Sequence, residues 1–313
     1  MNKKKPLCIF TMVHNEKRFL KLWLDYYSQS FDAEDIYVFD HCSNESLYHK
    51  TIGEPYHPDP RSSYWIQDTE TDLPCQVKRL THNSAMNCAS EMFYDILWMQ
   101  EFLRDTISDL MTRYEYVVLT DPDDFLFPNP EKYKNLRDYI ETLKSKGISN
   151  SRAVGYECVH QTSEPDLDWN RKIFGEQRNY WMRYGMWDKT MINSKIITWS
   201  SGFHFVIDDY TPCDQDLLLC HLQRIDYEHR LARQLDNYDW FYKHGKRQNG
   251  IVPDDNNLRL PNPLKLWKNN FHSIEFRPVT KGGKGLRVRA GDTAHIRGEI
   301  EKIPDNYIEW MVI

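Results

Sequence analysis

The stretch LCIFTMV at residues 7–13 decides the fold, because a continuous apolar run is followed at once by polar residues 14–16. Such a run is typical of a strand buried on both faces of a mostly parallel sheet. Apolar side chains then recur at helical spacing up to about Ser30, and residues 36–39 form a second apolar run that ends at Asp40. The order strand, helix, strand predicts a βαβ unit with its binding crevice at the carboxyl ends of the strands.

Further elements follow the same rules of periodicity. Residues 49–75 are rich in turn residues, and we expect them to run over the surface. Residues 85–110 repeat apolar side chains every three or four positions and predict a long amphipathic helix. Other predicted strands lie at residues 116–120, 153–160, 196–199, 203–207 and 217–222, and another helix at 227–235.

The composition restricts the class of protein. The net charge of −6 argues against a dedicated nucleic-acid binder, which usually carries a basic excess. With 40% apolar and 27% charged residues, the chain has the balance of a soluble globular protein. Basic residues gather in the last part of the chain, where they indicate either a solvated surface or an anion-binding flap.

The cysteines and the amino-terminal run bear on location. Seven cysteines without a short repeated spacing predict neither a disulfide framework nor a zinc ribbon, so we expect reduced thiols and a cytoplasmic protein. The first apolar run is too short for a membrane span, and we expect a strand there rather than a signal peptide. A membrane-associated acceptor and peripheral membrane contact remain compatible with this sequence.

An acidic group directly follows the predicted strand at residues 116–120. Asp121 and Asp123 are separated by one residue, so both carboxylates can approach a divalent cation such as Mg²⁺ or Mn²⁺. Such a cation binds the two phosphates of a nucleotide diphosphate. A simple turn is the alternative, since Asp and Pro are ordinary turn residues.

The ordered motifs resemble a known family. The motifs are VHNE at residues 13–16, WLDYY at 23–27, the strand ending at Asp40 and DPDDF at 121–125, with WNRKIFG at 169–175 and GFH at 202–204 further on. In this order they resemble the family-2-like glycosyltransferases of the GT-A fold. The resemblance is strongest to the branch with an amino-terminal Asn-Glu helix and an Asp-x-Asp-Glu-Phe element. It implies an α/β fold with a Rossmann-related, mostly parallel central sheet flanked by helices.

The resemblance implies roles for the first half of the chain. Val13, Asn15, Glu16 and Asp40 would hold the nucleobase and ribose of a nucleotide sugar. Asn15 can instead cap the first helix, or do both. Asp121 and Asp123 match the metal element, with Asp121 nearer the ribose and Asp123 the more direct ligand. Asp124 stands where the family more often has Glu, and we expect it to orient backbone amides.

Later residues are implied to complete the site. His204 and His221 are the two candidates for a histidine in the metal shell, and His204 is preferred because Gly202 lies close before it. Lys189 would meet the diphosphate as a point charge.

An inverting transfer also needs a carboxylate base within hydrogen-bond reach of the acceptor hydroxyl. Glu157, Asp214 and Asp216 are the candidates for this base, and the sequence does not choose among them.

The expected organisation has three parts. Residues 1–130 would form the nucleotide-sugar-binding half of the core and residues 131–240 the acceptor-binding half, followed by a small, irregular basic extension at residues 241–313. The predicted activity is transfer of a sugar from a nucleotide-diphosphate sugar, with UDP favoured, to a glycan or lipid-linked acceptor with Mn²⁺ or Mg²⁺. A metal-dependent nucleotidyltransferase or phosphohydrolase, or a non-catalytic carbohydrate-binding protein, are the alternatives.

Overall fold

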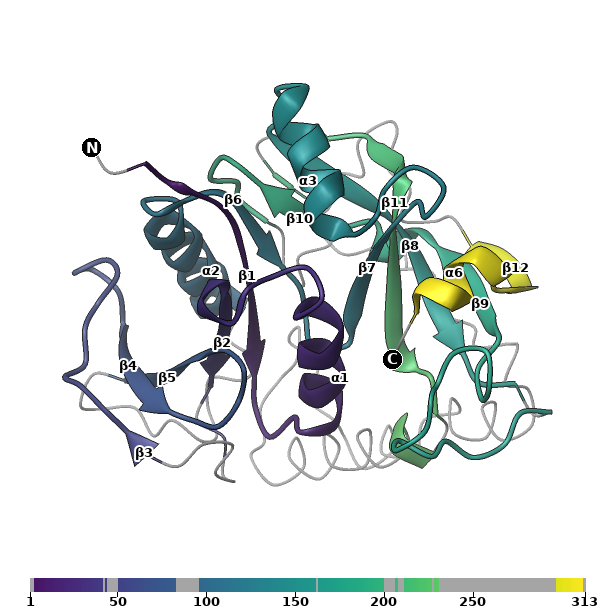
Figure 1. Ribbon diagram of the computed structural model, residues 1–313. Coiled ribbons are helices and arrows are strands. Elements are labelled where there is room, and N and C mark those ends of the chain that lie inside the picture. The colour runs from purple at the N-terminus through teal and green to yellow at the C-terminus, as the bar shows by residue number, and fades with distance from the viewer. Residues whose placement is uncertain are drawn as a thin grey trace, which may run out of the picture.

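The computed structural model describes residues 3–41, 43, 50–82, 96–161, 163–199, 206–207, 211–226, 228–230 and 297–311. Within them the chain forms a large mixed sheet with helices against it (Figure 1). The strands are β1 (Lys5–Val13), β2 (Ile36–Asp40), β3 (Lys50–Thr51), β4 (Tyr64–Glu70), β5 (Gln76–His82), β6 (Tyr114–Leu119), β7 (Asp124–Pro128), β8 (Asn150–Val159), β9 (Tyr180–Tyr184), β10 (Thr190–Asn193), β11 (Cys213–Arg224) and β12 (Arg297–Lys302). The helices are α1 (Arg18–Tyr27), α2 (Ile96–Leu110), α3 (Leu136–Ser145) and α6 (Asp305–Trp310), with single 3₁₀ turns η1 (Ala33–Asp35) and η2 (Gly185–Trp187).

The parallel part of the sheet confirms the predicted βαβ unit. β6, β1, β2 and β5 lie side by side in this order, and each neighbouring pair is parallel. β1 is the innermost of these strands, and its apolar segment from Leu7 to Phe10 is almost completely buried. β1, β2 and β6 therefore deliver the residues that follow them to one edge of the sheet.

The rest of the sheet is mostly antiparallel, so the expectation of a mostly parallel sheet is wrong for this part. β10 joins β6 and β8 in antiparallel fashion, and β9 and β12 continue the sheet antiparallel beyond β8. β11 lies between β7, to which it is antiparallel, and β8, to which it is parallel. The short connections seen here, such as the turn between β9 and β10, allow antiparallel neighbours without crossover helices.

Several predicted elements differ from the observed ones. The turn-rich segment 49–75 contains β4, where Tyr64 and Ile66 alternate with more exposed residues as in a half-buried strand. Its prolines hid this alternation. Residues 196–198 form no strand, and Trp199 makes only an isolated bridge with Val206. The long helix is described only from Ile96 onward, and most of segments 203–207 and 227–235 lies outside the described residues.

Helix α1 ties the first part of the chain to the acidic segment. Trp23 donates from its indole N–H to Thr120 Oγ1 at 2.7 Å. Tyr27 Oη accepts from the Leu126 amide at 3.0 Å and donates to the Asp124 carbonyl at 3.1 Å, while Tyr26 donates to the Leu126 carbonyl. In Figure 1 α1 lies between β1 and β7 in the view. The aromatic face of α1 thus fixes the backbone at both ends of the acidic turn.

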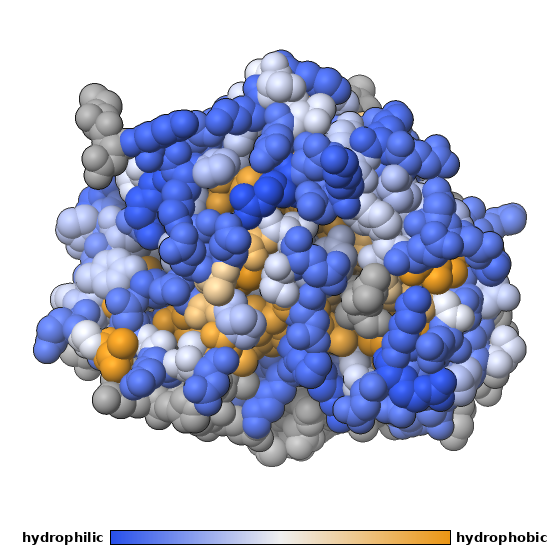
Figure 2. Space-filling view, viewed as in Figure 1, coloured by the Kyte–Doolittle hydropathy of each residue, from blue (hydrophilic) through white to orange (hydrophobic). Residues whose placement is uncertain are grey.

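The end of the chain adds to the sheet. β12 pairs with β9, and Tyr307 of α6 lies against Trp181 (Figure 1). Within the predicted irregular extension, residues 297–311 therefore contain regular structure, whereas residues 241–296 lie outside the described residues. In the space-filling view, apolar residues gather in the middle of one face between hydrophilic margins (Figure 2).

Two further expectations concern location. Among the described helices, none has the length and apolarity that crossing a bilayer requires. The five cysteines within the described ranges are all free thiols.

Candidate metal centre

The acidic segment sits on a turn between two buried strands. β6 ends at Leu119, Thr120 is fully buried, and the Asp124 amide donates to the Asp121 carbonyl at 3.0 Å to close the turn. The Asp123 carbonyl accepts from the Leu222 amide of β11 at 2.8 Å. The backbone of the turn is therefore held from both sides before any ligand binds.

Strand register brings a histidine to this turn. Asp124 of β7 lies directly opposite His221 of β11. One ligand atom each of Asp123, Asp124 and His221 lies within 4.8 Å of the others, and all three residues are buried. We call these three residues the DDH cluster. His221 Nε2 lies 3.8 Å from Asp123 Oδ2.

The imidazole of His221 is held through its other nitrogen. His221 Nδ1 lies 2.9 Å from Glu157 Oε2, and the Trp187 ring stacks on the imidazole at 4.1 Å between centroids. Because Nδ1 is occupied by a carboxylate, Nε2 is the nitrogen that faces Asp123. A carboxylate behind a histidine in this way fixes the tautomer and the ring orientation of metal-binding histidines.

Glu157 is in turn fully engaged. Its Oε1 accepts from the Arg224 amide at 3.0 Å, and its Oε2 accepts from Arg224 Nη1 at 2.5 Å and from Trp187 Nε1 at 2.7 Å. Burial alone would raise the pKa of Glu157. Arg224 and His221 together lower this pKa by more than burial raises it, so the net pKa lies below that of a free glutamate. A buried carboxylate with this set of donors orients His221 and does not reach an acceptor hydroxyl.

Lys189 lies directly before β10, and its side chain contacts the DDH cluster. Its Nζ donates to Asp124 Oδ2 at 2.7 Å and to Asp121 Oδ2 at 3.1 Å, and only 2% of its side chain is exposed. Lys189 therefore lies beside the carboxylates, and its contact with a diphosphate stays a prediction. The Asp121 side chain is the most open of these groups, at 39% exposed, and lies where a ligand can reach it.

Carboxylates outnumber permanent cations among the described residues of the site. The charged side chains connected by these contacts are Asp121, Asp123, Asp124, Glu157, Lys189, Arg224 and His221. Within this described set, four are carboxylates and two are permanent cations. Asp124 Oδ1 is buried without any hydrogen-bond partner. Buried charge of this kind is costly unless a counter-ion balances it.

The pKa values reflect the same imbalance. Burial raises the pKa of Asp124 to about 6, against the lowering effect of Lys189. Burial lowers the pKa of His221, but Glu157 and Asp123 raise it more, so the net pKa lies above that of a free histidine. Both groups therefore hold protons more readily than usual, and a cation can displace those protons.

The donor set fits a divalent cation. Two carboxylates and one imidazole would hold the ion. Carboxylate oxygens suit Mg²⁺ and Mn²⁺. Asp124, which we expect from the sequence to orient amides, would belong to this ligand set in place of Asp121, and Lys189 donates to both of these aspartates. His204, the preferred histidine by sequence, lies outside the described residues.

The residues expected to hold the nucleotide meet at the ends of β1 and β2. Val13 pairs with Asp40, and the Asn15 amide donates to Ser43 Oγ at 2.9 Å. Asp40 is fully buried, accepts from the Ser43 amide at 3.0 Å and lies 3.9 Å from Arg79. Burial raises the pKa of Asp40 against the lowering effect of Ser43 and Arg79. The structure brings these residues together, and Asp40 bonds to the chain through Oδ1 while its Oδ2 is buried without a hydrogen-bond partner.

The helix cap differs from the sequence expectation. Glu16, not Asn15, accepts a hydrogen bond from the first turn of α1, at 3.1 Å from the Phe19 amide. Asn15 adopts a left-handed backbone with φ of 55°, a conformation that Asn tolerates better than most residues. Asn15 therefore shapes the loop after β1.

Asp214 and Asp216 lie away from the DDH cluster. β11 runs antiparallel to β7, so its start lies beside Pro128 and its end beside Asp124. Asp214 pairs with Ala153 and His221 pairs with Glu157, and these two partners lie four positions apart on β8, which corresponds to about 13 Å. Asp214 accepts from Tyr139 and Asp216 pairs with Lys132. Neither can act as the base of a reaction at the cluster.

Sequence reasoning missed Trp187 and Arg224. Arg224 donates to Glu157, and Trp187 donates to Glu157 and stacks on His221, but no local sequence pattern marks either residue. Compared with known proteins, the chain matches no protein-family model and no curated protein. The interpretation of the site therefore depends on its motifs and its geometry.

Proposed function

We propose that this chain is a metal-dependent glycosyltransferase that takes a sugar from a nucleotide-diphosphate sugar, with UDP as the favoured nucleotide. The observation that carries the proposal is the DDH cluster after the carboxyl end of β6, in which Asp124 Oδ1 is buried without a hydrogen-bond partner. The cluster follows β6, which lies two strands from β2 and Asp40 in the sheet.

The chemistry follows from this arrangement. A bound Mn²⁺ or Mg²⁺ would neutralise the charge that builds up on the leaving diphosphate. The acceptor oxygen bonds to the anomeric carbon, the bond from that carbon to the diphosphate oxygen breaks, and its electron pair leaves with the nucleotide diphosphate. The acceptor proton passes to a base, in an inverting transfer to a glycan or lipid-linked acceptor. Lys189 and the turn around Asp121 hold the ligand set in place.

The positions of the three carboxylates expected as the base argue against each of them. Glu157 is buried and saturated by its donors, and Asp214 and Asp216 lie at the other end of β11. None of the three is both near the DDH cluster and open to an acceptor. Their contacts instead support an orienting role for Glu157 and structural roles for the two aspartates.

The test compares binding and turnover. We expect Mn²⁺ and UDP together to raise the melting temperature of the chain more than either alone. A panel of UDP-, GDP-, ADP- and dTDP-sugars should include one donor that is hydrolysed slowly in the presence of the metal. Asp123→Ala should abolish both effects, and Asp25→Asn, on the exposed face of α1, should change neither.

The alternatives predict other outcomes. A nucleotidyltransferase or phosphohydrolase would consume a nucleoside triphosphate or a phosphodiester with the same metal. A carbohydrate-binding protein would bind sugar without metal-dependent donor hydrolysis. If no nucleotide diphosphate shifts the melting temperature in the presence of Mn²⁺, the proposed function is wrong.

A further inference from the structure

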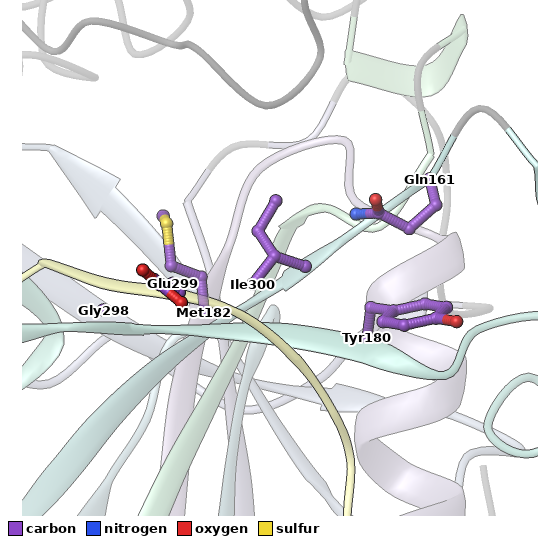
Figure 3. Close-up of a pocket in the computed structure, with 6 residues that line it drawn as sticks. All are labelled: Gln161, Tyr180, Met182, Gly298, Glu299 and Ile300. Atoms are coloured by element: carbon purple, nitrogen blue, oxygen red, sulfur yellow. The ribbon is translucent and has the colours of Figure 1, made fainter.

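An open hollow of about 380 Å³ lies at the far end of the sheet (Figure 3). It is lined by Gln161, Tyr180, Met182, Gly298, Glu299 and Ile300. These residues come from β9, from β12 and from the segment just after β8. In Figure 3 the side chains of Met182 and Ile300 rise side by side, and the amide of Gln161 points toward Ile300. The hollow therefore lies at the carboxyl end of β8.

Strand register relates this hollow to the DDH cluster. His221 lies opposite Glu157, Glu157 opposite Met182, and Met182 opposite Ile300. Side chains of directly paired residues project from the same face of a sheet. A single row of residues across four strands thus connects the cluster to the hollow. The contact between Tyr184 and Trp187 confirms that β9 turns this face toward the cluster, because Tyr184 lies two positions from Met182.

The other face of β9 is already covered. Trp181 lies against Tyr156 and Tyr307, and its indole N–H donates to Glu301. Helix α6 therefore packs on the face opposite to the hollow. Among the described residues, the hollow face at β9 and β12 is the one left for a ligand.

The distance between the DDH cluster and the hollow suits a second substrate. Neighbouring strands lie about 4.8 Å apart, so Met182 is about 10 Å and Ile300 about 15 Å from His221. A ligand in the hollow would not touch the metal. It would lie beyond the group that the metal holds, with Trp187 between the two.

The lining has the chemistry of a sugar subsite. Met182 and Ile300 give an apolar floor, and the half-buried Tyr180 offers an aromatic face on which the apolar side of a pyranose ring can pack. The Gln161 amide and the exposed Glu299 carboxylate can bond to ring hydroxyls. An apolar wall with a small number of polar groups is typical of small-molecule sites.

We propose that this hollow is a subsite for a sugar ring of the acceptor. The assignment to the acceptor depends on the proposed glycosyltransferase function, whereas the assignment to a sugar depends on the hollow alone. A glycan bound there would direct one of its hydroxyl groups along the row toward the DDH cluster.

The binding test uses free sugars. Saturation-transfer difference NMR is recorded on the full chain with glucose, galactose, mannose, N-acetylglucosamine and N-acetylgalactosamine, without metal or nucleotide. At least one sugar should receive saturation. Tyr180→Ala should weaken its binding by about tenfold, the loss expected when a contact aromatic is truncated. Tyr180→Phe, which keeps the ring, should bind nearly as well as the unchanged chain.

The controls separate binding from folding. Glu309 is an exposed residue of α6, which packs on the face of the sheet opposite to the hollow. Glu309→Ala should therefore leave sugar binding unchanged. Thermal unfolding of Tyr180→Ala should match that of Tyr180→Phe. Absence of saturation transfer to every sugar would overturn the proposal, as would equal binding by Tyr180→Ala and the unchanged chain.

Failure of the sugar-subsite proposal can be distinguished from failure of the proposed glycosyltransferase function. Tyr180→Ala should keep the stabilisation by Mn²⁺ and UDP and the slow donor hydrolysis, while its KM for an acceptor sugar rises. Asp123→Ala should lose the metal effects and keep the sugar signal. Loss of the Mn²⁺ and UDP effects in Tyr180→Ala would contradict the separation of the two sites and overturn the subsite.

Discussion

Arg178 and Asp124 are both fully buried charged residues, but their surroundings differ. Arg178 donates to the carbonyls of Pro165, Gln177 and Ile225 and lies 3.3 Å from Asp226. Its guanidinium is thus surrounded by acceptors. Asp124 has Lys189 on one oxygen and no partner on the other, among further carboxylates. One buried charge is satisfied by the chain, and the other is left partly unsatisfied.

The difference separates a structural cluster from a binding cluster. Around Arg178 the backbone supplies the acceptors, so the charge serves to join the segment before β9 to the end of β11. Around the DDH cluster several carboxylates lie together, and Asp124 Oδ1 is buried without a hydrogen-bond partner. Buried polar groups without partners are rare in folded proteins. An unsatisfied carboxylate beside a held histidine therefore indicates a place for a cation.

The largest expected effect concerns Arg178. Arg178→Ala should lower the free energy of unfolding by about 3–5 kcal/mol, because it removes the cation paired with the buried Asp226 and leaves several carbonyls without their donor. Denaturant unfolding measures this loss. The control Arg171→Ala removes an exposed ion pair with Glu176 and should cost less than about 1 kcal/mol. Equal stability of the two variants would contradict a structural role for the Arg178 cluster.

Metal binding should stabilise only through the DDH cluster. Mn²⁺ at a hundredfold excess over its Kd should raise the free energy of unfolding by about 2.7 kcal/mol. Asp123→Asn should remove this gain and, without metal, be at least as stable as the unchanged chain, since it relieves like-charge repulsion. Unfolding curves with Mn²⁺ and after chelation measure both. A variant that is still stabilised by Mn²⁺ would place the ion elsewhere.

Glu157 should act on the metal through His221. Glu157→Gln should weaken Mn²⁺ binding by about 10- to 100-fold, the usual effect of removing a carboxylate that orients a metal-binding histidine. Titration calorimetry measures the affinity. Asp226→Asn, in the Arg178 cluster, should lower stability and leave the Mn²⁺ affinity unchanged. The comparison between the clusters would fail if both variants weakened metal binding alike.

The smallest expected effect is the dependence of the Mn²⁺ affinity on pH. The pKa of Asp124 is raised to about 6 by burial, so protons compete with the metal below that value. Mn²⁺ affinity should level off only when both Asp124 and His221, whose pKa is also raised, have lost their protons, and it should fall by about tenfold per pH unit below 6 for each proton displaced. Without metal the sign reverses for this group: a raised carboxyl pKa means that its stability contribution is lost as pH rises through about 6. An affinity independent of pH between 5 and 8 would contradict this.

Local pattern was enough for the first part of the fold. The apolar run of β1, the periodicity of α1 and the run of β2 are each encoded by neighbouring residues, and the structure confirms them. The same holds for the strand that leads into Asp121, because a buried strand reads as a continuous apolar run. Local pattern gave the wrong prediction for the turn-rich segment around β4. Its prolines concealed a strand that pairs with the following strand, β5.

The sequence by itself also placed Asp121, Asp123 and Lys189 near one another through a family resemblance, and offered His221 without preferring it. Only the tertiary structure decided that His221 lies opposite Asp124, that Glu157 holds the imidazole and that Asp214 lies far away. Those facts depend on the register between β7, β11 and β8, whose residues are separated by up to about a hundred positions. Local periodicity sets which residues form a strand, but long-range pairing and burial set which side chains meet.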